Sequence, residues 1–149
     1  MKSQRKYVVA VALMFATVTA AWAREETLDQ LKAKLQSAKT SDQPKIAVEI
    51  AQLQLKATDK AYAAGNNKEA QVLLGDLVSN ARHATDAASE SGKHLKNTEI
   101  EIRKMAQRLK DIQPTLDIDE RPPVQHAIDQ LERMRNQLLD RMFRKDHNR

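Results

Sequence analysis

One stretch decides the fold of this chain: residues 67–112, which read NKEAQVLLGDLVSNARHATDAASESGKHLKNTEIEIRKMAQRLKDI. Apolar and small residues recur in it at alternating steps of three and four, which is the spacing of a heptad seam. At 1.5 Å per residue, an unbroken helix over this stretch would be roughly 70 Å long. The pattern predicts one long central helix. Its seam consists of Leu74, Leu77, Ala81, Ala84, Ala88, Ser91, Leu95, Thr98, Ile102, Met105, Leu109 and Ile112.

A break near residues 92–97 is the alternative to a continuous helix. Gly92 could end one helix, and Thr98 with Glu101 has the spacing of a capping box that starts another. The heptad phase is unchanged across Gly92, however, and an interior glycine costs only about 1 kcal/mol relative to alanine. We favour the continuous helix, and the break stays open as an alternative.

Three further helices are predicted around this central one. A capping-box pattern at Thr27 starts a helix over residues 28–39, and Pro44 suits the first turn of a second helix over 44–64. Gly65 suits the end of that helix, and the last helix runs over residues 123–144. We expect an all-α fold, an elongated antiparallel bundle of coiled-coil hairpins, with the second helix packed between the first and the central one.

The first residues have the pattern of an export signal. A basic start is followed by an apolar run over residues 7–20 and by small residues on both sides of Trp22. We predict a signal peptide over residues 1–23 with cleavage after Ala23, which leaves one helical domain over residues 24–149 in the periplasm or outside the cell. The apolar run is shorter than the roughly 20 residues that span a bilayer, so we expect membrane contact only before cleavage.

Charge and cysteine content exclude several classes of function. Without its first 23 residues, the chain keeps 22 of its 25 basic residues against 20 acidic ones, so its charge falls from +5 to +2. Neither that balance nor export favours a nucleic-acid partner. No cysteine is present, which excludes thiol catalysis, thiolate metal sites and disulfides.

The sequence contains no recognisable catalytic or metal-binding constellation. The acidic residues Asp117, Asp119 and Glu120 lack the glycine of a calcium loop and are followed by two prolines. His83 and His94 are about 16 Å apart along a helix, too far to share one ion. We therefore predict no enzyme, no cofactor, no metal and no small-molecule substrate.

The one candidate surface is basic and lies toward the second half of the chain. It is predicted to dock on an acidic partner, although a solvated helical surface explains the same charges. Its residues are Lys93, Lys96, Arg103, Lys104, Arg108, Lys110, Arg135 and Arg141.

Self-association is a separate expectation. The small residues between Ala81 and Gly92 leave room for a second helix to approach closely. An antiparallel dimer through this small-residue stripe is therefore predicted.

The segment AYAAGNNKEA, residues 61–70, followed by three leucines, resembles the turn of a tetratricopeptide hairpin. The resemblance covers about residues 46–81 and implies close packing of two helices and a role in scaffolding protein complexes. It departs from that family because no second copy follows at a 34-residue period. The overall plan also resembles small exported helical proteins of bacteria, which implies location rather than activity.

These observations favour an exported, non-enzymatic helical module that binds a protein partner or a second copy of itself. The alternative is a periplasmic holdase chaperone or envelope-stress protein, for which a small helical cradle would be suitable.

Overall fold

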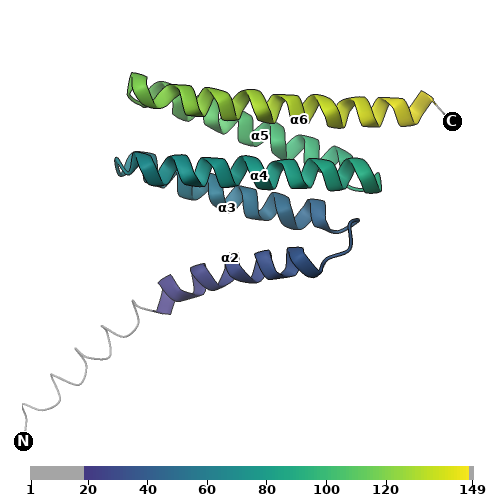
Figure 1. Ribbon diagram of the computed structural model, residues 1–149, viewed down its shortest axis with the longest axis horizontal. Coiled ribbons are helices and arrows are strands. Elements are labelled where there is room, and N and C mark those ends of the chain that lie inside the picture. The colour runs from purple at the N-terminus through teal and green to yellow at the C-terminus, as the bar shows by residue number, and fades with distance from the viewer. Residues whose placement is uncertain (1–18, 148–149) are drawn as a thin grey trace, which may run out of the picture.

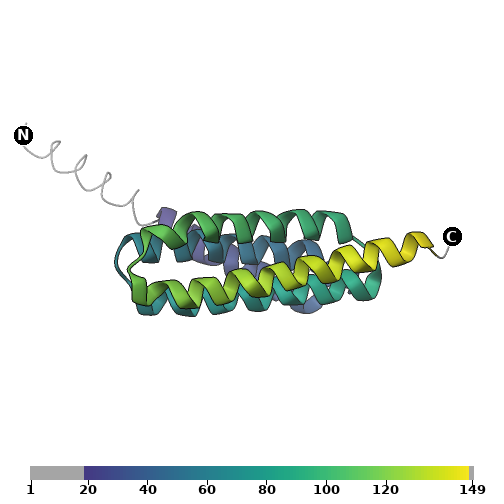
Figure 2. The same ribbon diagram turned by 90° about the horizontal axis from the view of Figure 1, so that it is seen from above.

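The computed structural model describes residues 19–147, and these form an all-α bundle with no strand. Five α-helices follow one another: α2 (Thr19–Ser37), α3 (Gln43–Ala63), α4 (Asn67–Ser91), α5 (Leu95–Ile112) and α6 (Arg121–His147). Helices α3 to α6 run side by side along the molecule, and the last turns of α6 extend past α4 and α5 (Figures 1 and 2). The predicted signal peptide lies mostly outside the described residues.

Helices α3 and α4 form the first hairpin, and the backbone conformation of a glycine allows its turn. Gly65 adopts φ +76°, its N–H donates to the carbonyl of Tyr62 (3.0 Å), and the N–H of Asn66 donates to Ala61 (2.8 Å). This pair of hydrogen bonds is the Schellman motif, which satisfies the last carbonyls of a helix and reverses the chain. The predicted end of the second helix at Gly65 is confirmed.

The predicted long central helix is wrong, because the chain reverses at residues 92–94. Gly92 (φ 67°) and His94 (φ 59°) both adopt the left-handed conformation, which ends α4 and starts α5. The alternative break near residues 92–97 is correct. The heptad phase persists across the turn because α4 and α5 both face the same core. The apolar pattern indicates which residues face that core, but it does not indicate the direction of the chain.

Helices α5 and α6 form the second hairpin. Two short 3₁₀ segments, Gln113–Thr115 and Ile118–Glu120, connect them, and α6 opens at Arg121 just before the two prolines. Leu116 packs partly against the core, whereas Ile118 is 77% exposed. Within so short a connection, only one of the two apolar residues reaches the bundle.

The two hairpins stack on each other with matching helix directions. Gln52 contacts Glu101, Asp59 contacts Arg108, and each of these pairs is 49 positions apart. On the other side, Arg82 of α4 donates to Gln130 of α6 at 2.7 Å. Helix α3 therefore runs parallel to α5, and α4 parallel to α6. The packing is closer along the α4–α6 side than along the α3–α5 side.

The core lies between these four helices and includes the small-residue stripe. Ala81, Ala84 and Ala88 are fully buried, and they belong to the same apolar cluster as Leu131 and Leu138 of α6. Alanines leave space for a neighbouring backbone, and the chain's own helices fill that space. These three alanines are therefore covered by helices of the same chain, and self-association stays a prediction.

Helix α2 covers part of the outer side of α3. It begins before the predicted start at residue 28 and ends at Ser37, so the Thr27 capping box lies within a helix rather than at its start. Ala20, Ala21 and Ala23 are strong helix formers and carry the helix through Thr27. Leu35 packs against the core, and α3 contacts α2 on one side and α4 and α5 on the others, as predicted for the second helix.

Among residues 19–147, no helix combines the length and the apolar character that a membrane span requires.

Candidate functional site

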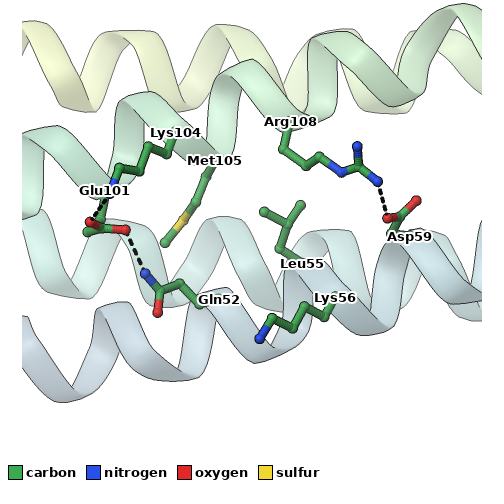
Figure 3. A pocket seen from close by; sticks show the side chains of 8 residues that line it. All are labelled: Gln52, Leu55, Lys56, Asp59, Glu101, Lys104, Met105 and Arg108. Atoms are coloured by element: carbon green, nitrogen blue, oxygen red, sulfur yellow. Dashed lines mark hydrogen bonds and ion pairs between the residues drawn. The ribbon is translucent and has the colours of Figure 1, made fainter.

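An open groove lies between α3 and α5, where the two hairpins approach least closely. It encloses about 450 Å³, and α3 and α5 each contribute one wall (Figure 3). Both walls carry an apolar side chain and several polar ones. The lining residues are Gln52, Leu55, Lys56, Asp59, Glu101, Lys104, Met105 and Arg108.

The middle of the groove is apolar. Leu55 of α3 and Met105 of α5 lie between the two sets of polar contacts, as Figure 3 shows. Met105 belongs to the buried core, and Leu55 is partly buried and packs against it. Because methionine is flexible and polarisable, it adapts to apolar groups of different shapes. The groove can therefore contact an apolar side chain without a change in the helices.

Each end of the groove carries a polar bridge between the helices. At one end, Glu101 accepts hydrogen bonds from Gln52 (2.6 Å) and Lys104 (2.8 Å). At the other end, Arg108 pairs with Asp59, and the hydrogen bond and charge of that carboxylate raise the pKa of Arg108. Lys56 lies on the rim without an ion-pair partner among the described residues. The bridges leave one uncompensated positive charge.

The groove continues toward the turn between the hairpins. An adjoining hollow of about 370 Å³ shares Gln52 and Glu101 with it and reaches Val48 and His94. His94 is the one described residue other than glycine with a positive φ, a conformation that costs roughly 1 kcal/mol or more for a residue with a side chain. His94 therefore lines the adjoining hollow from a left-handed backbone position.

The structure distributes the predicted basic surface over several sides of the molecule. Lys104 and Arg108 line the groove. Arg103 and Arg135 both approach Glu99, and Lys110 pairs with Glu132, so these side chains lie on the α6 side of α5.

The remaining residues of the predicted surface lie elsewhere. Arg141 contacts the end of α4 through the carbonyl of Ser89. Lys93 lies in the turn, and Lys96 lies exposed in the first turn of α5. The structure therefore brings only Lys104 and Arg108 together in the groove.

Sequence reasoning missed the α3 side of this groove. Gln52, Leu55 and Asp59 belong to a helix whose partner lies 49 residues away, and no local spacing predicts that pairing. The available signal was the second apolar stripe of α3, which includes Val48 and Leu55 and requires a neighbour on that side.

The described residues offer little for metal or acid–base chemistry. Nowhere in residues 19–147 do three or more histidine or carboxylate side chains converge as metal ligands would. In the groove, cationic side chains engage both carboxylates, Asp59 and Glu101. His83, a metal candidate by residue type, has its Nε2 3.0 Å from the amide oxygen of Gln43.

Comparison with known protein families, with characterised proteins and with solved structures gives no match.

Proposed function

We propose that this chain is a non-enzymatic helical module that binds a segment of another protein in the α3–α5 groove. The observation that carries the proposal is the groove itself, with its apolar middle at Leu55 and Met105 and its charged bridges at both ends. Grooves between packed helices accept amphipathic segments by burying an apolar anchor between polar contacts.

The polar bridges support binding because they can change partners at low cost. Arg108 and Asp59 retain 52% and 37% of their side-chain exposure, and water screens the attraction of an exposed ion pair, so the pair contributes little to stability. A partner that supplies its own carboxylate or amide can replace these contacts without a large penalty. Burial of its apolar side chain against Leu55 then supplies the net gain in free energy.

Photo-crosslinking in the living cell tests this function. A photoreactive residue at position 56, on the rim of the groove, is expected to capture a discrete protein partner. Leu55→Glu, which places a charge in the apolar middle, is expected to abolish that adduct. Val72→Glu is the matched control, because Val72 is 67% exposed on α4 and does not line the groove. Equal yields of adduct from the photoreactive protein alone, from its Leu55→Glu form and from its Val72→Glu form would overturn the proposal.

We also propose that the protein acts outside the cytoplasm after cleavage behind Ala23. The basic start and the apolar run over residues 7–20 support this location. Cell fractionation with mass determination of the isolated chain tests it. A species that begins at Arg24 in the exported fraction is expected, and a cytoplasmic chain that retains Met1 would contradict it.

A further inference from the structure

A second hollow, separate from the α3–α5 groove, lies between the ends of α4 and α6. It encloses about 480 Å³ and is lined by one residue of α4 and six of α6. Three of the lining residues are arginines, Arg133, Arg141 and Arg144, whereas Asp140 is the one acidic residue among them. The lining therefore carries a net charge of +2. We call it the arginine pocket.

Two of these arginines are unusual in this molecule. Most arginine side chains that the structure describes form a hydrogen bond or an ion pair with a group of the same chain: Arg82, Arg103, Arg108, Arg121, Arg135 and Arg141. Among the described side chains, the exceptions are Arg133 and Arg144, for which neither a hydrogen bond nor an ion pair is found. Both line the arginine pocket.

Arg141 holds the two helices together at this place. Its Nε donates to the carbonyl of Ser89 at 3.0 Å, where a cation also compensates the negative end of the α4 dipole. This contact occupies one donor and leaves the terminal nitrogens of the guanidinium for a ligand. The pocket therefore has a central cation that is held against α4 and two flanking cations.

We propose that the arginine pocket binds a phosphate group. Arginine binds phosphate through paired, charge-assisted hydrogen bonds, and three arginines line this hollow. The phosphate belongs either to a free small molecule or to the headgroup of an anionic phospholipid, and the two sources share this chemistry. The site does not depend on the proposed function of the α3–α5 groove.

Titration with inorganic phosphate, followed by amide NMR of the protein as isolated from cells, tests the proposal. Saturable shifts are expected at Ser89 and at the three arginines, and sodium chloride of equal ionic strength is expected to give none. Arg133→Gln combined with Arg144→Gln is expected to weaken binding about tenfold or more, since each contributes charge-assisted hydrogen bonds. Arg82→Gln is the matched control, because it removes a charge at the same helix pair outside the pocket.

Absence of saturable shifts, or equal weakening in Arg82→Gln and in the double variant, would overturn the proposal.

Vesicles distinguish the two sources of phosphate. Co-sedimentation uses vesicles of phosphatidylglycerol and phosphatidylcholine, with pure phosphatidylcholine as reference. If the wild type binds the anionic vesicles and the double arginine variant does not, the result supports the site with a lipid headgroup as its ligand. Phosphate binding without vesicle binding supports the site with a small-molecule ligand.

Discussion

Arg135 of α6 donates a 2.7 Å hydrogen bond from Nε to the carboxylate of Glu99 on α5, which retains only 10% of its side-chain exposure. Arg103 approaches the same carboxylate from its own helix at 3.7 Å. The contact therefore joins the two helices of the second hairpin through a charge that water reaches poorly.

Arg135→Leu is expected to lower the free energy of unfolding by about 2–3 kcal/mol. Removal of one partner of a buried pair leaves an uncompensated charge, at a cost of roughly 3–5 kcal/mol, and the partial exposure of Arg135 reduces that cost. Arg103→Leu is expected to cost less than about 1 kcal/mol because that pair is longer and more exposed. Urea denaturation of both variants tests whether Arg135→Leu costs more stability than Arg103→Leu. Equal losses of the free energy of unfolding would contradict this expectation.

Replacement by alanine is expected to change the free energy of unfolding in opposite directions at two glycines. Gly75 lies exposed within α4, and the space that an alanine methyl group would occupy there is open, so Gly75→Ala is expected to stabilise the protein by roughly 0.5–1 kcal/mol. Gly65 also has open space, but its φ of +76° strains any L residue, so Gly65→Ala is expected to cost about 1–2 kcal/mol. Thermal and urea unfolding test both variants. A change in stability of the same sign in the two variants would show that backbone conformation is not decisive.

The buried alanines of α4 are expected to control the fold of the single chain. Because Ala84 and Ala88 are fully buried, either residue replaced by leucine overfills the core and is expected to cost about 1–3 kcal/mol. Ser79→Leu, at an exposed position of the same helix, is the control and is expected to be nearly neutral. Urea denaturation combined with light scattering tests this. Unchanged stability with a changed molecular mass would instead place these residues in an interface.

Local chemistry made much of this fold predictable from sequence. The turn at Gly65 and the start of α6 at its two prolines follow from residues whose backbone preferences act within a few positions. The reversal at Gly92 and His94 did not follow, because periodicity shows which side of a helix is buried and not whether its axis turns back. The left-handed conformation of His94 is also unusual for a residue other than glycine.

The two candidate sites depend on long-range pairing and were less predictable. The charges of Lys104 and Arg108 were recognised, but their contacts on α3 are set by the parallel stacking of the hairpins. Arg141 was likewise recognised as a cation, whereas its contact with the carbonyl of Ser89 depends on how α6 packs over the end of α4. Composition indicates charge, and only the packed bundle shows which charges lack a partner.

Tyr62→Phe is expected to stabilise the protein at neutral pH and to change its response to alkali. The phenolic oxygen of Tyr62 is buried without a hydrogen-bond partner, so its removal is expected to raise the free energy of unfolding by about 1 kcal/mol. Burial, together with the negative charge of Glu120, raises the pKa of Tyr62 above its ordinary value.

The sign of the alkaline effect follows from proton binding. Above a pH of about 10, the unfolded chain loses the tyrosine proton while the folded protein keeps it, so the free energy of unfolding falls as the pH rises toward the folded pKa. The phenylalanine variant lacks this contribution, so its advantage over the wild type is expected to widen between neutral pH and pH values above about 10. Urea denaturation of both proteins across this range tests the linkage, because the lysines titrate equally in the two. A constant difference would show that the Tyr62 hydroxyl reaches water in the folded protein.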